Sequence, residues 1–257
     1  MANRKTIKDI QSSKGSEKLA VLTAYDAQMA KMLEEAGIDM ILVGDSLGNV
    51  VLGMETTLGV SVKDILRHTQ AVTQAAKHTF VIADMPFGSY QESPEQAFRN
   101  ASKFLSIGGA QAVKLEGGQT MATTVKKLTQ SGIPVMGHVG LTPQYVHQLG
   151  GFAKQGKTEI AAKAILQDAL ALEAAGAFSL VIECTDHNLA EKITQELRIP
   201  TIGFGSGTAC DGQVLVINDL LGLATYKIPS FVKPRVDLRS IITETAQSFV
   251  TDTKKGL

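Results

Sequence analysis

The sequence predicts a single-domain (β/α)8 TIM barrel over residues 1–257, with a short N-terminal helix closing the bottom of the barrel. Short apolar segments alternate with longer segments of helical pattern along the whole chain, and no linker or low-complexity stretch interrupts them. A length of 257 residues, 44% of them hydrophobic, suits one such barrel. An open, doubly wound sheet is the alternative, but no G-x-G-x-x-G motif follows the first apolar segment, which counts against its dinucleotide-binding form.

The apolar segments are predicted to be parallel strands, because several are nearly continuous in Val, Ile, Leu and Ala, as strands covered on both faces are. In chain order they are Leu19–Tyr25, Met40–Asp45, Phe80–Met85, Ala112–Glu116, Pro134–Val139, Leu180–Cys184, Pro200–Phe204 and Val214–Ile217. The last of these is open to a second interpretation, since residues 214–222 also fit a helix.

The segments between the strands carry the signals that begin and end helices. Ser61 with Asp64 forms a capping-box pattern, and Ser93 followed by Pro94 predicts a second helix start. Glycines expected to end helices in the left-handed conformation are Gly37, Gly132 and Gly176.

Three further helices are expected. Thr6–Ser12 is predicted to be the short helix at the barrel bottom, and Thr158–Ala175 to be a long amphipathic helix rich in Ala and Leu. The last helix is predicted over Asp237–Phe249, followed by a charged tail that frays.

Composition favours an enzyme that acts on a small molecule. Lys+Arg and Asp+Glu both total 25, so the net charge is zero and no basic patch indicates a nucleic-acid partner. The N-terminus has no apolar run typical of a secretion signal, and no segment approaches the roughly 18–20 apolar residues that cross a bilayer. Two cysteines are too few for a disulfide scaffold. We therefore expect a cytoplasmic protein without a membrane partner.

Four acidic residues lie at or near the carboxyl ends of predicted strands: Asp45, Asp84, Glu116 and Glu183. In a barrel these ends open onto the active-site face. Four carboxylates in one partly buried mouth are costly without a cation, and oxygen ligands without a Cys/His cluster indicate Mg²⁺. The alternative is that each acid caps the helix that follows, which is more plausible for one acid than for four.

Other polar residues near the predicted mouth allow two interpretations each. Lys114 lies two residues before Glu116, so both side chains point to the same face, where Lys114 can hold a substrate carboxylate or simply pair with Glu116. His138 fits a structural hydrogen-bond donor as well as a catalytic residue. Gly203–Gly207, after the seventh strand, fits a phosphate-binding loop or a tight turn.

Six segments carry recognisable motifs. They are TAYDAQMAKMLEEAGIDMILVGDSLGNVVLG (23–53), IADMPFGSYQESPEQAFRNA (82–101), AVKLEGG (112–118), GHVGLTPQYVHQLGGFAKQGK (137–157), DALALEAAGAFSLVIEC (168–184) and IPTIGFGSGTACDGQVLV (199–216). Together they resemble the ketopantoate hydroxymethyltransferase family. The resemblance runs from about residue 4 to 250, and VGDSLG and GHVGLTPQ are specific even alone.

The resemblance implies a (β/α)8 barrel that uses 5,10-methylenetetrahydrofolate to hydroxymethylate the 2-oxo acid 3-methyl-2-oxobutanoate, giving 2-dehydropantoate for pantothenate synthesis. It further implies a homodecamer. The residues it assigns are Asp45, Asp84 and Glu116 as Mg²⁺ ligands, Asp45, Ser46, Asp84 and Lys114 as substrate contacts, Glu183 as catalytic base, and His138 as a residue near the substrate.

Two other functions compete with this one. Enzymes of the phosphoenolpyruvate mutase and isocitrate lyase group also hold Mg²⁺ and an enolate in such a barrel, but their K-K-C-G-H-type loop is absent from the sequence. A ligand-binding barrel that has lost catalysis would be expected to lack Glu183 or a metal ligand, and all are present.

Overall fold

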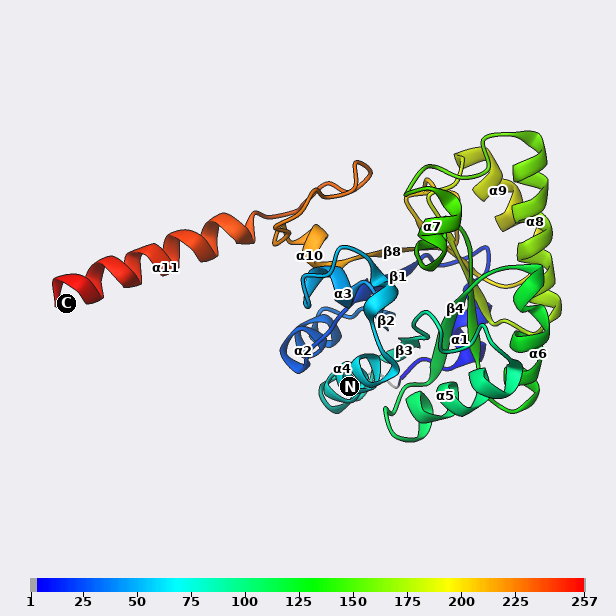
Figure 1. Cartoon of the computed structure of the whole chain (residues 1–257), viewed down its shortest axis with the longest axis horizontal. Helices are drawn as coiled ribbons and strands as arrows, with labels where there is room; N and C mark the ends of the chain where they lie inside the picture. Colours follow the sequence, from blue (N-terminus) through cyan, green and yellow to red (C-terminus); the bar gives the residue numbers. More distant parts are fainter. Residues whose placement is uncertain (1–3, 257) are drawn as a thin grey trace. The chain divides into compact units, whose positions relative to one another are not determined.

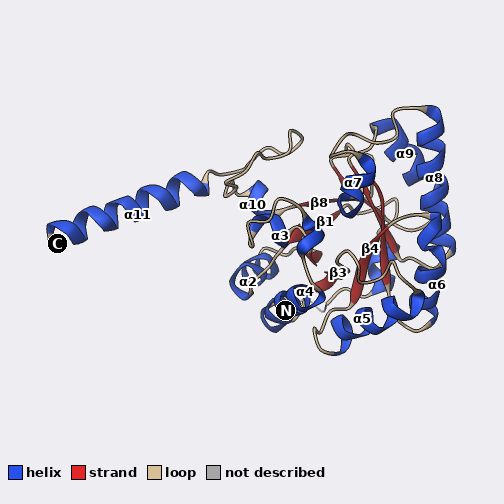
Figure 2. Cartoon of the chain, in the orientation of Figure 1, coloured by secondary structure: helices blue, strands red, loops and turns tan. Residues whose placement is uncertain are grey.

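The structure, a computed structural model, describes residues 4–256. Within them, parallel strands close into a barrel in the order β1 to β8, with helices around the outside (Figures 1 and 2). The strands are β1 (Leu19–Thr23), β2 (Met40–Val43), β3 (Phe80–Asp84), β4 (Ala112–Glu116), β5 (Val135–Gly140), β6 (Ser179–Glu183), β7 (Thr201–Phe204) and β8 (Gly212–Leu215). The predicted barrel is confirmed, and its closure excludes the open sheet.

Helices separate the strands, as the alternating pattern predicts. They are α1 (Ile7–Ser12), α2 (Ala27–Glu35), α3 (Leu47–Val50), α4 (Val62–Ala75), α5 (Pro94–Ser106), α6 (Ala122–Gln130), α7 (Val146–Leu149), α8 (Glu159–Ala174) and α9 (His187–Glu196), with short 3-10 helices at Thr57–Gly59, Gln119–Met121 and Pro143–Tyr145. Among the described residues, no helix is long and apolar enough to cross a membrane.

The predicted helix boundaries are confirmed where a cap carries the signal. The Ser61 hydroxyl accepts a hydrogen bond from the backbone N–H of Asp64 and completes a capping box, and Ser93 caps α5 with Pro94 in its first turn. Left-handed backbone at the predicted glycines follows α2, α6 and α8: Gly37 (φ 79°), Gly132 (φ 82°) and Gly176 (φ 97°).

Helix α1 closes the bottom of the barrel. Ile10 is fully buried in an apolar cluster with the first residues of several strands, among them Leu19, Met40 and Phe80. Burying one such side chain contributes roughly 1.5–3 kcal/mol. The predicted role of the N-terminal helix is therefore confirmed.

The eighth strand was predicted at the wrong position. It spans Gly212–Leu215 rather than Val214–Ile217, and helix α10 (Ile217–Leu220) follows at once. At Gly212 an added Cβ would lie 2.5 Å from the carbonyl oxygen of Leu19, so β8 approaches β1 too closely for a side chain. Gly212, which permits closure, is of a residue type that is common in turns and rare inside strands. The sequence pattern therefore did not indicate that the strand begins there.

The chain divides into two compact units after Val214, and the second begins at Leu215. The second contains α10 and α11 (Leu238–Lys255), with α11 beginning at its cap, Asp237. The predicted end of this helix at Phe249 was wrong, because the helix includes the charged tail. Lys254 and Lys255 lie in its last turn, where cations interact favourably with the helix dipole. The single-domain boundary of 1–257 stays a prediction.

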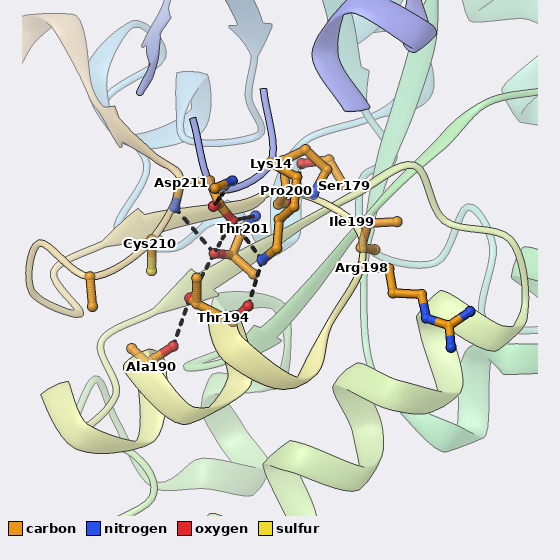
Figure 3. Close-up of polar contacts among 12 residues, drawn as sticks. Lys14, Ser179, Ala190, Thr194, Arg198, Ile199, Pro200, Thr201, Cys210 and Asp211 are labelled. Atoms are coloured by element: carbon orange, nitrogen blue, oxygen red, sulfur yellow. Dashed lines mark hydrogen bonds and ion pairs between the residues drawn. The ribbon is translucent and has the colours of Figure 1, made fainter. Parts of the chain in front are cut away.

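A buried polar network ties the two ends of the barrel sheet together at its bottom (Figure 3). Asp211 accepts hydrogen bonds from the backbone N–H (2.8 Å) and the hydroxyl (3.0 Å) of Thr201. The same carboxylate accepts from the Lys14 ammonium at 2.9 Å and from the backbone N–H of Gly15 at 3.0 Å. The segment after α1 is thereby joined to β7 and to the start of β8.

We expect Asp211→Asn to lower the free energy of unfolding by about 2–3 kcal/mol at pH 7, because it removes one partner of a buried ion pair. Burial raises the pKa of Asp211, but hydrogen bonds from Thr201 and Lys14 outweigh it and hold that pKa below its usual 3.8. The stabilisation is therefore present above about pH 4 and disappears as pH falls through the lowered pKa. Urea unfolding of the wild type and of the variant at pH 7 and pH 3 measures this difference in free energy. Equal unfolding midpoints of the two proteins at pH 7 would contradict the prediction.

Candidate active site

The predicted site residues gather at the carboxyl ends of five neighbouring strands. Asp45 follows β2, Asp84 ends β3, Lys114 and Glu116 lie in β4, His138 lies in β5 and Glu183 ends β6. The parallel register places Asp84 opposite Lys114 and Glu116 opposite His138. All six residues are buried, the most exposed being Glu183 at 9%.

Asp84 and Lys114 form an ion pair at the centre of this group. The Lys114 ammonium lies 3.0 Å from Oδ1 of Asp84, and the backbone N–H of Asp45 donates to Oδ2 at 3.0 Å. Burial raises the pKa of Asp84 to about 7; Lys114 opposes this rise and Asp45 adds to it. Burial alone would lower the pKa of Lys114, but the neighbouring carboxylates outweigh burial and raise it, so the ammonium stays charged.

His138 lies between two carboxylates. Its Nδ1 is 3.5 Å from Glu116 and its Nε2 is 3.1 Å from Glu183, while the Lys114 ammonium lies 3.4 Å from Nδ1. Burial and Lys114 lower the pKa of His138, but the two carboxylates outweigh them and raise it to about 9. The ring is therefore protonated at neutral pH and offsets part of the negative charge of its neighbours.

The backbone around Glu183 is tightly constrained. An added Cβ at Gly140 would lie 2.3 Å from the carbonyl oxygen of Glu183, so β5 passes against β6 where only glycine fits. Cys184, the next residue, has φ 47°, a left-handed conformation that costs a residue with a side chain roughly 1–2 kcal/mol. These constraints set where the Glu183 side chain leaves the strand.

Ser46 lies beside Asp45, just after β2. Its hydroxyl is 2.8 Å from the Tyr25 hydroxyl and is not used to cap α3. Being only partly buried, it can reach a molecule in the barrel mouth.

Two residues of the site were not predicted. Gln144 is buried and contacts both Asp45 and Glu116, and Tyr90 contacts Gln144 and the backbone of Glu116. Both lie inside the resembling segments, but neither carries a charge and neither lies in a strand. Nothing in the local pattern separated them from ordinary loop residues.

The structure favours the turn interpretation of Gly203–Gly207. The hydroxyl of Ser206 donates to the carbonyl of Ile182 at 2.9 Å and accepts from the backbone N–H of Thr185 at 3.0 Å. Gly207, at φ 85°, packs so close to His187 that a Cβ would lie 2.1 Å from its ring. The polar group of the loop is thus used to hold β6 and β7 together.

The donor set fits a hard divalent cation. Within residues 4–256, no three or more His, Cys, Asp or Glu side chains are placed so that they alone could hold a metal ion. Mg²⁺ does not need such a group, since it commonly binds one or two carboxylates and completes its shell with water and substrate oxygens. The carboxylates of Asp45, Asp84 and Glu116 are all buried, and hard oxygen donors of this kind suit such a cation.

Sequence comparison assigns the family. The family model described as Ketopantoate hydroxymethyltransferase matches residues 4–257. The chain belongs to the ketopantoate hydroxymethyltransferase family. It is 54% identical to a 3-methyl-2-oxobutanoate hydroxymethyltransferase of Syntrophus aciditrophicus over 95% of this chain and 89% of that protein. The corresponding protein of Dehalococcoides mccartyi is 52% identical over 98% and 90%.

Several solved structures share the fold of this chain, although their sequence identity to it is low. A phosphoenolpyruvate phosphomutase from Streptomyces platensis has a TM-score of 0.66 and 14% identity, covering 98% of this chain and 88% of its own. A phosphonopyruvate hydrolase has a TM-score of 0.65 and 12% identity, covering 97% and 87%. This likeness extends to the barrel alone, so the mutase-type alternative has no support beyond the fold.

Proposed function

We propose that this chain transfers a hydroxymethyl group from 5,10-methylenetetrahydrofolate to 3-methyl-2-oxobutanoate, giving 2-dehydropantoate, with Mg²⁺ as cofactor. The observation that carries the proposal is the position of Glu183, a buried carboxylate 3.1 Å from His138, whose other ring nitrogen lies 3.4 Å from the Lys114 ammonium. A family member with this arrangement has a candidate base and an anion-binding cation on either side of one imidazole ring.

Some of the side chains would bind the substrate, and others would transfer the proton. Lys114 is the cation that would hold the carboxylate of the oxo acid, and the Ser46 hydroxyl would add a neutral contact. Glu183 would accept the proton from C3, while protonated His138, 3.1 Å away, stabilises its charged form before that transfer. Carbon C3 then bonds to the methylene carbon while the bonds from that carbon to the two folate nitrogens break. Water provides the hydroxyl, and tetrahydrofolate leaves with one proton from C3 and one from water.

Asp45, Asp84 and Glu116 would hold the metal. When bound, Mg²⁺ supplies Lewis-acid stabilisation of the charge that develops on the ketone oxygen. Two facts support the choice of metal: Asp45, Asp84 and Glu116 are buried carboxylates, and a phosphonopyruvate hydrolase of the same fold forms a complex with oxalate and Mg²⁺.

An NMR assay with 3-methyl-2-oxobutanoate, 5,10-methylenetetrahydrofolate and Mg²⁺ tests the proposal directly. We expect 2-dehydropantoate to form only when all three are present. Product formation from phosphoenolpyruvate or an isocitrate-like acid, with none from the oxo acid, would overturn it. The homodecamer and the cytoplasmic location stay predictions, and light scattering of the purified protein tests the former.

We expect Lys114→Met to raise KM for the oxo acid about tenfold to a hundredfold, because it removes a charge-assisted contact worth roughly 1.5–3 kcal/mol. Steady-state kinetics measures this effect. Lys14→Met is the matched control, since Lys14 also forms an ion pair, with Asp211 at 2.9 Å, but at the opposite end of the barrel. The control should lose stability and keep its KM. If both variants keep the wild-type KM, Lys114 is only a structural partner of Asp84.

A further inference from the structure

Gln144 connects two of the expected metal ligands. It lies in the 3-10 helix Pro143–Tyr145, which begins three residues after the end of β5, and is 3% exposed. Its side-chain Nε2 donates to Oδ2 of Asp45 at 2.9 Å, and its backbone N–H donates to Oε2 of Glu116 at 3.0 Å. One neutral residue thereby binds one oxygen of each carboxylate.

The orientation of the Gln144 amide is determined by its other contacts. Its Nε2 also donates to the carbonyl oxygen of Met85 at 2.9 Å, and its Oε1 accepts from the Tyr90 hydroxyl at 2.8 Å and from Nε2 of Gln91 at 3.1 Å. Both amide hydrogens and both lone pairs of the oxygen are therefore used. A flipped amide would place its oxygen against the Asp45 carboxylate and the Met85 carbonyl, which are both acceptors, so Gln144 must present its N–H to Asp45.

We propose that Gln144 is a positioning residue that holds Asp45 and Glu116 at the spacing required to bind a divalent cation. This inference rests on the metal site of the proposed function. Asp45 follows β2 and Glu116 ends β4, so the two carboxylates come from strands that are not neighbours. Gln144 contacts Oδ2 of Asp45 and Oε2 of Glu116, so Oδ1 of Asp45 and Oε1 of Glu116 are left to other partners.

A neutral amide suits this position on electrostatic grounds. A lysine or arginine contacting both carboxylates would compete with the cation for their charge, and another carboxylate would repel them. An amide orients a carboxylate through a hydrogen bond and leaves its charge in place.

Tyr90 supports Gln144 from the other side. Its hydroxyl accepts from the backbone N–H of Glu116 at 3.1 Å, besides its bond to Gln144, and the side chain is fully buried. Tyr90→Phe removes only the hydroxyl and keeps the ring packing. It therefore weakens the hold on Gln144 without deleting the amide.

Calorimetric titration of the full-length protein with Mg²⁺ alone tests the inference. Gln144→Met keeps the side-chain length and the backbone bond to Glu116 but removes the amide from Asp45. Loss of a group that orients metal ligands typically weakens metal binding about 10–100-fold, so we expect a Mg²⁺ Kd higher by that factor. Tyr90→Phe should raise the Kd about threefold to tenfold. In Gln144→Met, kcat should return toward the wild-type value as Mg²⁺ is raised.

Gln111→Met is the matched control. Gln111 also bonds through both ends of its amide, to the backbone of Val81 and Gly109, but at the opposite end of β4. Its Mg²⁺ Kd should equal that of the wild type even if its melting temperature falls. If Gln144→Met does not fold, as judged by circular dichroism, Tyr90→Phe decides the question.

The outcomes separate this inference from the proposed function. If the wild-type protein binds Mg²⁺ and the folded Gln144→Met or Tyr90→Phe variant binds it with unchanged Kd, Gln144 does not position the ligands and the inference is wrong, while the proposed function stands. If the wild-type protein binds no Mg²⁺, both are wrong.

Discussion

Glu183→Gln is expected to slow exchange of the C3 proton of 3-methyl-2-oxobutanoate with deuterium by about 10²–10⁴-fold, the usual cost of removing a general base. The glutamine has nearly the same volume and hydrogen-bonding reach but cannot accept the proton. Proton NMR in D₂O with Mg²⁺ and without folate isolates this step from transfer of the one-carbon unit. Binding of the oxo acid should persist, because Lys114 is unchanged.

Glu173→Gln provides the control for this substitution. Glu173, in α8, accepts hydrogen bonds from the backbone N–H groups of Arg198 and Ile199 and lies outside the site. It should exchange the C3 proton at the wild-type rate. If Glu183→Gln also exchanges at that rate, another residue is the base, and His138 is the first to test. If the variant no longer binds the oxo acid, Glu183 belongs to the binding contacts instead.

Chelation with EDTA is expected to abolish product formation, and Mg²⁺ should restore it, because Lewis-acid stabilisation contributes several kcal/mol to barrier reduction. Asp84→Asn should reproduce the loss permanently, since it removes the charge of a buried carboxylate that is expected to bind the metal. Titration with Mg²⁺ should then show greatly weakened binding. Activity of the EDTA-treated wild-type enzyme at its full rate would contradict the metal requirement.

Asp211→Asn is the matched control for Asp84→Asn. Both substitutions neutralise a buried aspartate paired with a lysine, one at each end of the barrel. The Asp211 variant should be less stable but should bind Mg²⁺ with the wild-type Kd. Equal loss of Mg²⁺ binding in the two variants would mean that Asp84 acts only through stability.

The placement of the charged site residues could be predicted because strand geometry determines it. Parallel strands in a barrel all end at the same mouth, so acids at strand ends must come together there. The period of two along a strand also places Lys114 and Glu116 on one face, and the structure has both side chains in the same buried group. Strand geometry does not determine the distances between these side chains, which come from the structure.

The neutral residues Gln144 and Tyr90 could not be predicted, because they lie outside the strands whose geometry places the charged residues. Tyr90 lies in a loop and Gln144 in a single 3-10 turn, where no periodicity relates a side chain to the site, and their contacts join residues 26 to 99 positions apart in the chain. The error at β8 has a related origin. The close approach of Gly212 to Leu19 depends on a neighbour at the other end of the barrel, and a local pattern carries no information about it.

Closure of the barrel also has a consequence for its synthesis. Strand β1 is completed early, but its partner β8 follows near the end of the chain, and Lys14 and Asp211, which join the two regions, are 197 residues apart. A ribosome adding about 5–20 residues per second needs roughly 10–40 s to make the intervening chain. Throughout that interval β1 offers unpaired backbone N–H and C=O groups to other strands. The nascent polypeptide therefore passes through a period of exposure to aggregation that ends only when its last strand leaves the ribosome.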